Sequence, residues 1–273
     1  MTATPSRPAR RRPYTPAIRA SIGLHAAAPV ALLAAPTLLP WLAAGLIANH
    51  AMLTAAGMTP RSTLLGPNLR RLPTEAALPP TVALTFDDGP DPKVTPYVLD
   101  LLDAAGAKAS FFCIGTAARA HPALLRDIVA RGHSVENHTA THPYAFACYR
   151  PAALRREITD AQSLLADIAG TAPRFFRAPM GLRSPLFDPV LAETDLIYTS
   201  WTRRALDGTR RDPARATRRL TRGLAAGDIL LMHDGRCAIA PSGRAMVLEI
   251  LPAVLNALRD LNLRSQALSA ASR

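Results

Sequence analysis

After residue 80 the chain alternates between short runs rich in β-branched or aromatic residues and longer stretches with helical periodicity. Strands separated in this way by helices are typical of parallel α/β folds. No GxGxxG motif follows the first run, which argues against a dinucleotide-binding fold. We therefore expect a (β/α) barrel of fewer than eight strands. The expected strands are Val82–Phe86, Ser110–Ile114, Ser134–Asn137, Phe175–Arg177, Ile197–Trp201, Ile229–Met232 and Arg264–Leu268. The expected helices are Thr95–Ala105, Pro122–Ala130, Pro151–Ile168, Pro185–Glu193, Pro213–Leu224 and Arg244–Leu261.

The amino-terminal part of the chain is apolar and uncharged over a long stretch. From Ala20 to Pro60 it contains no Asp, Glu, Lys or Arg. A transmembrane helix needs about 20 apolar residues, whereas the apolar core of a signal peptide has only about 7–15. The run therefore favours an uncleaved membrane segment, either one span of roughly Pro29–Ala48 or a shallow hairpin of two short helices. A buried helical pair in a soluble protein is the third alternative.

These features divide the chain into four parts: a basic tail (residues 1–20), an apolar membrane-associated segment (21–56), a linker rich in Pro and Arg (57–80) and the α/β domain (81–268). Basic residues beside membrane segments stay on the cytoplasmic side. With one span, the five arginines of residues 5–19 would place the α/β domain outside a bacterial inner membrane, although Arg61, Arg70 and Arg71 act against this. With a hairpin, both flanks stay cytoplasmic. We expect the outward orientation.

The net charge of +12 is concentrated at the front of the chain. Residues 1–71 contain eight Arg and no acid, whereas the remainder has 24 Lys or Arg against 20 acids. The α/β domain is thus only mildly basic, and it carries no helix-turn-helix or zinc-knuckle spacing. We expect no nucleic-acid partner.

Polar residues follow most of the expected strands. They are Asp87 and Asp88 after the first strand, His138 and His142 after the third, Arg177 after the fourth, Trp201 to Asp207 after the fifth, and His233 after the sixth. In βα barrels the catalytic groups lie where strands end and loops begin. We therefore expect five loops to meet at one mouth.

Two of these clusters have the chemistry of a metal centre. His138 and His142 are four residues apart, a spacing that places both imidazoles on one side of a helical turn. A carboxylate with two histidines is a complete three-point donor set that leaves positions for water and substrate. The second carboxylate of the Asp87–Asp88 pair is then free to accept a proton. Asp-Gly-Pro is also ordinary turn chemistry, so the prediction depends on the combination.

Two further residues have chemistry that suits such a centre. Arg177 lies in a rigid Arg-Ala-Pro bend, where its guanidinium can orient a carboxylate. His233 ends an apolar strand, where it can act as a general acid near neutral pH. A surface ion pair and a capped core histidine are the respective alternatives.

The motifs TFDDGP, RGHSVEN followed by HTATH, RAP and LMHD occur in this order between about Thr81 and Ala267. With these motifs in this order, the chain resembles the polysaccharide deacetylase family, whose catalytic unit is the NodB-homology domain. The resemblance implies a distorted seven-stranded (β/α) barrel. It also implies a metal-dependent hydrolase that removes an N-acyl group from a carbohydrate such as a cell-envelope or lipid-linked glycan. The expected acyl group is N-acetyl.

By position, the resemblance implies a metal site and a general base. A divalent cation would be held by Asp88, His138 and His142. The expected ion is Zn²⁺, and Co²⁺, Ni²⁺ and Mn²⁺ are the alternatives. Asp87 would be the general base, kept ionised and oriented by Arg177.

The resemblance implies roles for the rest of the site as well. Asp207 would anchor Arg177, and His233 would protonate the departing sugar amine. The backbone N–H of Met180 would stabilise the oxyanion, and Leu231 with Trp201 would form an apolar floor for the acetyl methyl group.

The chain departs from the family pattern at two positions. Met180 stands where many relatives have Tyr, which changes the side wall of the substrate groove. Gly208 stands where the family has Trp, so an aromatic surface is missing unless Trp201 replaces it. Arg203–Arg222 contains eight Arg and two Asp; we expect a solvated helix face there, with attraction to a phosphate-linked lipid carrier or acidic head groups as the alternative.

Three other functions remain open on the sequence. The first is removal of a formyl group from a lipid-linked amino sugar, a reaction also found among relatives. The second is a catalytically silent carbohydrate-binding barrel, which the joint presence of the base, the metal ligands and the acid disfavours. A membrane adaptor would leave the cluster of polar loops unexplained.

Overall fold

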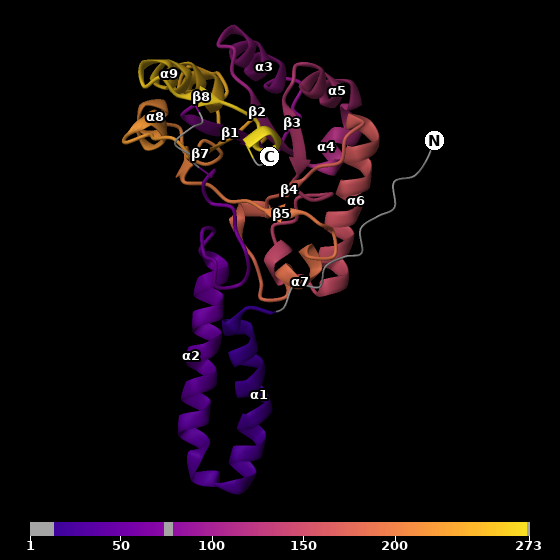
Figure 1. Cartoon of the computed structure of the whole chain (residues 1–273), viewed down its shortest axis with the longest axis vertical. Coiled ribbons are helices and arrows are strands. Elements are labelled where there is room, and N and C mark those ends of the chain that lie inside the picture. Colours follow the sequence, from indigo (N-terminus) through magenta and orange to yellow (C-terminus); the bar gives the residue numbers. More distant parts are fainter. Residues whose placement is uncertain (1–13, 74–78, 272–273) are drawn as a thin grey trace.

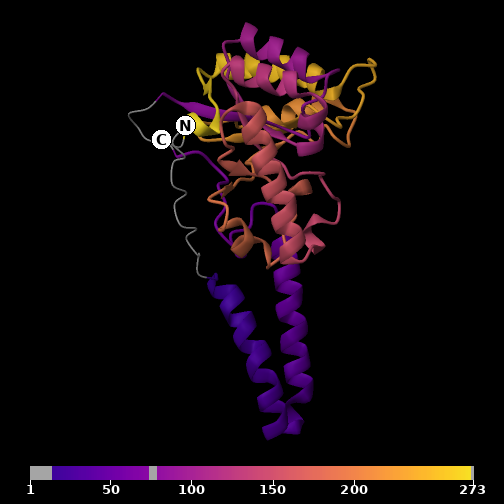
Figure 2. The same ribbon diagram turned by 90° about the vertical axis from the view of Figure 1, so that its right-hand side faces the viewer.

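The computed structural model describes residues 14–73 and 79–271. It consists of a curled parallel sheet surrounded by helices, with a long helical hairpin that projects from it (Figures 1 and 2). The strands are β1 (Thr81–Asp87), β2 (Ala109–Cys113), β3 (Ser134–Asn137), β4 (Phe175–Phe176), β5 (Ile197–Tyr198), β6 (Arg203–Arg204), β7 (Ile229–His233) and β8 (Arg264–Ser265).

The strand order is β5-β4-β3-β2-β1-β7-β6, and each pairing is parallel. β8 pairs with the first two residues of β1. Helices cover the outer face of the sheet (Figure 1). They are α3 (Thr95–Ala104), α4 (Gly115–Ala120), α5 (Pro122–Ala130), α6 (Pro151–Ala169), α7 (Phe187–Leu191), α8 (Pro213–Thr221) and α9 (Met246–Asp260). The short α10 (Leu268–Ala271) lies on the inner side instead, where Leu268 packs with Ala83 and Phe112. The α/β class and the barrel-like curl predicted from the sequence are confirmed.

Side chains along β1 alternate between the two faces of the sheet, so that core residues point outward and site residues point inward. Leu84 and Phe86 belong to the large apolar cluster between sheet and helices. Ala83 belongs to a second cluster, with Phe112, Phe175, Ile229 and Leu231 from the neighbouring strands. Successive strand residues face opposite sides of the sheet. Thr85 and Asp87 therefore share the inner face with Ala83, and the polar groups that end β1 point into the curl.

The curl is a half-barrel, because β5 and β6 do not pair with each other. The predicted linker fills part of this gap. The Leu69 amide donates to the Tyr198 carbonyl at 2.9 Å, the Ser200 amide donates to the Leu69 carbonyl at 3.0 Å, and the Leu72 amide donates to the Gly227 carbonyl at 2.8 Å. The described part of the linker is thus packed against the domain and does not hang free.

Two details of the sequence prediction differ from the structure. The seven expected strands include β8, which lies off the main order, and omit β6, whose two arginines have no strand-like pattern. The short helix α4 was also missed.

The apolar segment forms two antiparallel helices, α1 (Pro16–Ala34) and α2 (Leu39–Met58), joined by a short 3₁₀ turn (Pro36–Leu38). At 1.5 Å per residue each is about 30 Å long, the thickness of a bilayer core. One continuous helix over Pro29–Ala48 is not formed, because the chain turns at Pro36–Leu38; the hairpin alternative describes this segment, with helices longer than the short ones we considered. α1 also begins inside the predicted tail, whose first 13 residues lie outside the described part of the chain.

The hairpin is held by polar contacts between its helices and leaves its apolar side chains exposed. The Asn49 side-chain amide donates to the Ser21 hydroxyl at 2.9 Å, and His25 Nε2 lies 3.1 Å from His50 Nε2. Such contacts between helices are typical of membrane helix pairs. In the apolar windows of the two helices only 17% and 6% of the residues are buried. This is not the burial of a helical pair inside a soluble core.

Candidate active site

A cavity of about 190 Å³ opens at the carboxyl ends of the strands. Eight of the residues singled out from the sequence line it: Asp87, Asp88, His138, His142, Met180, Trp201, Leu231 and His233. Arg177 and Asp207 are fully buried and lie behind this surface, each in contact with one of the lining residues. The structure therefore brings the predicted loops together at one mouth.

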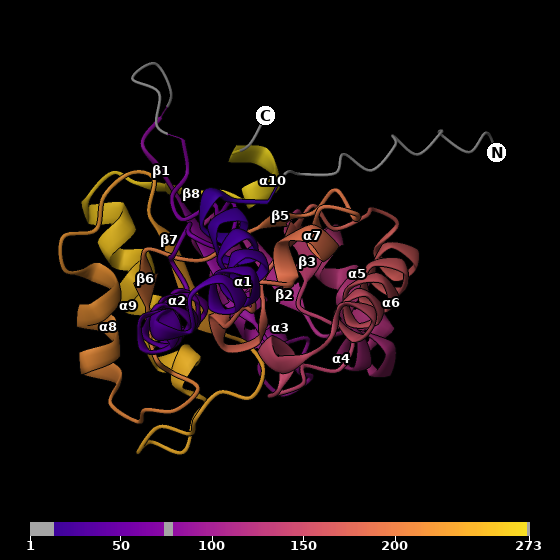
Figure 3. The same cartoon turned by 90° about the horizontal axis from the view of Figure 1, so that it is seen from below.

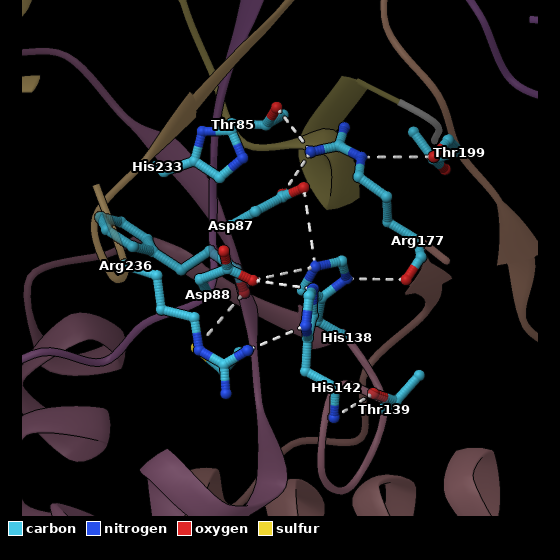
Figure 4. Close-up of polar contacts among 12 residues, drawn as sticks. Thr85, Asp87, Asp88, His138, Thr139, His142, Arg177, Thr199, His233 and Arg236 are labelled. Carbon is cyan, nitrogen blue, oxygen red and sulfur yellow. Dashed lines mark hydrogen bonds and ion pairs between the residues drawn. The ribbon is translucent and has the colours of Figure 1, made fainter. Parts of the chain in front are cut away.

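Asp87 and Asp88 point in different directions although they are neighbours. Asp87 is the last residue of β1 and stays on the inner face of the sheet. Asp88 has a φ of 75°, in the left-handed region, so the chain turns sharply and carries its carboxylate toward the histidines. One carboxylate thus joins the histidine cluster, while the other remains among the buried polar groups of the curl (Figure 4).

Arg177 holds Asp87 in a fixed position. Its Nη1 donates to Asp87 Oδ1 at 2.6 Å and to the Thr85 hydroxyl at 2.9 Å. Its Nε and Nη2 donate to the carbonyls of Thr199 and Ser200 at 3.3 and 3.2 Å, and the guanidinium lies 4.0 Å from the centre of the Phe112 ring. Every one of these contacts involves a buried group, so Arg177 and Asp87 have little freedom to move.

Asp88, His138 and His142 form a compact triad whose ligand atoms lie within 4.8 Å of one another. Asp88 Oδ1 is 3.3 Å from His138 Nε2 and 3.2 Å from His142 Nε2. This oxygen is buried between the two imidazoles. Three ligands at about 2.0–2.1 Å around a tetrahedral zinc would lie roughly 3.3 Å apart. The donor set and its spacing thus fit a divalent cation.

The histidines converge through an irregular loop, because residues 138–142 form no helix. Thr139 and His142 have φ values of 70° and 55°, and the Thr139 hydroxyl accepts from the His142 amide at 2.9 Å. The predicted helical turn is therefore wrong, although the predicted convergence is right. His138 Nδ1 donates to the Arg177 carbonyl at 2.7 Å, which leaves its Nε2 lone pair directed at the triad.

His142 has a different environment on its outer side. Arg236 Nη1 lies 3.0 Å from His142 Nδ1. A guanidinium can only donate, so Nδ1 must accept, and in the neutral imidazole the proton is on Nε2, which faces Asp88. A cation at the triad needs that Nε2 lone pair, so Arg236 and the cation compete for the tautomer of His142.

The electrostatics of the triad favour an ionised carboxylate and one neutral imidazole. Burial alone would raise the pKa of Asp88, but its hydrogen bond with His138 and the charges of the nearby histidines outweigh this and lower that pKa to about 2. Burial, followed by the charge of His138, lowers the pKa of His142 to about 4. Both shifts favour the protonation states that metal ligands require.

Asp207 binds His233, which corrects the predicted contact with Arg177. His233 Nδ1 donates to Asp207 Oδ1 at 2.7 Å, and the His233 amide donates to Asp207 Oδ2 at 2.9 Å. Burial opposes a charged imidazole, but the charge and hydrogen bond of Asp207 prevail and raise the pKa of His233 to about 9. His233 is therefore protonated at neutral pH, with its Nε2 free to donate.

The two residues predicted to form an apolar floor lie together in the cavity. Leu231 and Trp201 line the cavity and belong to the same buried cluster. Met180 has a φ of 57°, and its side chain is 38% exposed at the mouth. At Gly208 an added Cβ would lie 3.9 Å from the His233 ring, so the aromatic group of the family pattern is replaced by open space beside the imidazole.

Sequence reasoning missed two cationic residues of the cavity. Arg236 contacts His142, and Arg204 lies 5.2 Å from the centre of the Trp201 ring. The Nε of Arg204 is buried and has no hydrogen-bond partner among the described residues. Arg204 is inside the arginine-rich stretch that we expected to be a solvated helix face. Its place next to Trp201 was the only sequence signal that distinguished it from the other arginines.

Comparison with known proteins identifies relatives of this chain in sequence and in structure. The family model described as polysaccharide deacetylase matches residues 75–199. A chitooligosaccharide deacetylase from Sinorhizobium fredii is 36% identical over 167 residues, which cover 61% of this chain and 78% of that protein. The chain belongs to the polysaccharide deacetylase family.

Other members of the polysaccharide deacetylase family agree in sequence and fold. A peptidoglycan-N-acetylglucosamine deacetylase from Bacillus cereus is 33% identical over 156 residues, which cover 56% of this chain and 72% of that protein. The crystal structure of the Bc1960 peptidoglycan N-acetylglucosamine deacetylase superposes with a TM-score of 0.67 at 27% identity, over 75% of this chain and 92% of that one. The predicted family, fold and enzyme class, a carbohydrate N-deacetylase, are confirmed.

Proposed function

We propose that this carbohydrate N-deacetylase uses a zinc ion held by Asp88, His138 and His142 to remove acetyl groups from amino sugars beside a membrane. The main support is the position of two proton-transfer groups in one cavity with the triad: Asp87, fixed by Arg177, and His233, fixed by Asp207. The names of the relatives supply the acetyl group and the amino sugar, because they are deacetylases of chitooligosaccharides and of peptidoglycan N-acetylglucosamine.

The proposed reaction needs one proton accepted and one donated. A divalent cation held by the triad would supply a Lewis acid that lowers the pKa of a water ligand from about 15.7 towards about 7. Asp87 Oδ2 lies 3.8 Å from His138 Nε2, beside the triad, and accepts the proton of the attacking water. The hydroxyl group adds to the amide carbon, the C–N bond breaks, and His233 donates a proton to the departing amine. The products are acetate and the free amino sugar.

The remaining lining residues orient the acyl group. Leu231 and Trp201 offer an apolar surface to the acetyl methyl. The Met180 backbone amide is the proposed donor to the oxyanion, as the family resemblance implies. Because this contact uses the backbone, the replacement of Tyr by Met leaves it intact.

We also propose that the hairpin anchors the enzyme in the bacterial inner membrane. α1 and α2 each have an apolar window, with mean hydropathies of 1.5 and 1.3. A hairpin returns the chain to the side from which it entered, and arginines flank it at both ends: five in residues 5–19, then Arg61, Arg70 and Arg71. The positive-inside rule then places the catalytic domain in the cytoplasm. This replaces the outward orientation that we expected for a single span.

Replacement of single site residues tests the proposed mechanism. Asp87→Asn should abolish acetate release but keep the bound metal, because Asp87 is not in the triad. His138→Ala should lose both. Acetate and formate release from matched N-acetyl and N-formyl chitooligosaccharides, together with metal content by elemental analysis, are the measurements. Normal activity of the Asp87→Asn enzyme would contradict the proposed mechanism. Formate release that is faster than acetate release would show that the substrate carries a formyl group instead of an acetyl group.

A further inference from the structure

A second hollow lies where α2 meets the catalytic domain, outside the active site. Its volume is about 700 Å³. Arg61, Arg70 and Arg71 line one part of it, and Met52 and Ala55, from the last turns of α2, line another. We call this hollow the arginine groove. Met52 and Ala55 place it at the end of α2 that adjoins the domain, and Figures 1 and 3 show this end of the hairpin beside the domain.

Among the described residues, little negative charge compensates the arginine groove. Arg61 and Arg70 are exposed, and within this part of the chain they donate to the carbonyls of Thr202 and Arg61, each at 3.5 Å. Arg71 pairs with Asp228 at 2.9 Å, but Asp228 also takes Arg203 at 2.5 Å. No acidic side chain among the described residues lines the groove. Three guanidinium groups on one surface suit an anion with several oxygens, such as a phosphate.

The apolar wall indicates what the anion is attached to. Met52 is 43% exposed on α2, and Trp41 and Ile47 on the same helix are also exposed. The wall of the groove is therefore continuous with the apolar surface of the hairpin. A free inorganic anion would contact only the arginines. A phosphate that carries a hydrocarbon chain would contact both the arginines and the apolar surface of the helix.

The arginine groove and the catalytic cavity share a thin wall. Trp201 lines the cavity and the next residue, Thr202, lines the groove. On the other side, Arg61 lines the groove and the preceding residue, Pro60, lies against Gly181 of the cavity; a Cβ added at Gly181 would be 2.8 Å from Pro60 and 2.6 Å from Trp201. One ligand can therefore place a phosphate in the groove and a sugar in the cavity.

We propose that the arginine groove binds the phosphate of a membrane lipid to which the N-acetylated amino sugar is attached. The enzyme then takes its sugar from a lipid carrier. This inference rests on the proposed deacetylation for the sugar, but the binding of the lipid phosphate can be measured without turnover.

Binding of prenyl ligands to the full chain in neutral detergent micelles provides the first test. Geranylgeranyl diphosphate, geranylgeraniol and inorganic phosphate are titrated by calorimetry. The diphosphate should bind at least about tenfold more tightly than either of the other two, because only it uses both the arginines and the apolar wall. Equal affinity for the alcohol would overturn the proposal, and equal affinity for inorganic phosphate would reduce the groove to a general anion site.

A matched pair of charge variants locates the site. Arg61→Gln/Arg70→Gln should weaken diphosphate binding by about tenfold or more, because two charged hydrogen-bond donors are lost. Arg218→Gln/Arg219→Gln removes the same charge from the exposed face of α8, away from the groove and the cavity, and should leave binding unchanged. An equal effect of the two double variants would show unspecific attraction and overturn the assignment.

Turnover separates this inference from the proposed function. Acetate release is compared for N-acetylglucosaminyl prenyl diphosphate in micelles and for soluble chitotriose. The Arg61→Gln/Arg70→Gln variant should lose at least about tenfold more activity on the lipid-linked substrate than on the soluble one. Equal losses on both would overturn the groove as a lipid site. If the cation-loaded wild-type enzyme hydrolyses neither substrate, the deacetylation fails, and the prenyl titrations still decide the groove.

Discussion

Among single residues, Asp207 has the clearest effect on its neighbour, because it accepts from both the ring and the amide of His233. The raised pKa of His233, about 9 against an ordinary 6.5, has a defined consequence for stability. The folded state holds this proton more tightly than the unfolded state does. The contribution of the pair to the free energy of unfolding is therefore fully present below pH 6.5 and is lost as the pH rises through about 9.

Asp207→Asn should shift the alkaline limb of the activity profile to lower pH. The amide no longer stabilises the imidazolium, so His233 loses its proton, and its ability to act as an acid, at a lower pH. In a profile of kcat/KM against pH, the limb should move by about one pH unit or more. Asp212→Asn, which removes an exposed charge at the start of α8, is the control and should leave the limb in place. An unmoved limb in Asp207→Asn would exclude His233 as the acid.

Arg236→Gln should tighten metal binding. The substitution removes both a nearby positive charge and the donor that fixes the proton of His142 on Nε2. The Gln oxygen can instead accept from Nδ1, and the dissociation constant for Zn²⁺ should fall by about tenfold, a typical effect of groups that orient a ligand. Competition with a chromogenic chelator measures it. Arg204→Gln removes a charge from the same cavity without touching His142, so an equal gain there would show that the tautomer is irrelevant.

The site residues that could be predicted are those whose neighbours in sequence carry the information. Asp87, Asp88, His138, His142 and His233 stand in short motifs at strand ends, so their common location followed from the alternation of strands and helices. The partner of Asp207 could not be predicted, because Arg177 and His233 are both distant in sequence and only the packing of β7 against β6 selects between them. Arg204 and Arg236 look like any other loop arginine until the loops are placed.

At the scale of elements, the longer strands and the helices opened by proline were predictable, because both patterns are local. β6 was not, since its pairing with Leu230 and Leu231 of β7 depends on the neighbouring strand alone. The number of strands also does not predict whether the barrel closes. β5 and β6 remain apart here, and the linker around Leu69 lies beside β5. The same count is compatible with a closed barrel.

The end of α2 is fixed to the catalytic domain by backbone contact. The Gly57 carbonyl accepts from the Arg183 amide at 3.1 Å, and a Cβ at Gly57 would lie 2.2 Å from the Arg183 carbonyl oxygen. Gly57→Ala should therefore separate the hairpin from the domain and destabilise the protein by about 1–3 kcal/mol, as overpacking does. Thermal unfolding in detergent measures this.

A matched glycine in the same helix separates contact from helix propensity. Gly45 has no atom within 4 Å of its would-be Cβ, so Gly45→Ala should be neutral or stabilise by about 0.5–1 kcal/mol. Equal unfolding temperatures for the Gly57→Ala and Gly45→Ala proteins would show that the contact with Arg183 contributes nothing to the docking.

At the scale of the whole molecule, the hairpin predicts the membrane topology of the chain. The segment before α1 and the end of the chain should lie on the same side of the membrane, and the turn at Pro36–Leu38 should lie on the other. Protease protection of epitope tags placed at residue 1, in the turn and at residue 273 measures this in inverted and right-side-out vesicles. Tags at the two ends of the chain that differ in protection would restore the single span.

The described part of the linker, residues 58–73, runs against the catalytic domain, and Pro60 touches the glycine that lines the active site. The distance between the hairpin and the cavity is therefore set by packing. In a bilayer, such an enzyme works at a fixed height above the lipid surface and meets its substrate by lateral diffusion in two dimensions. Sugars far along a long chain stay beyond its reach, however many acetyl groups they carry.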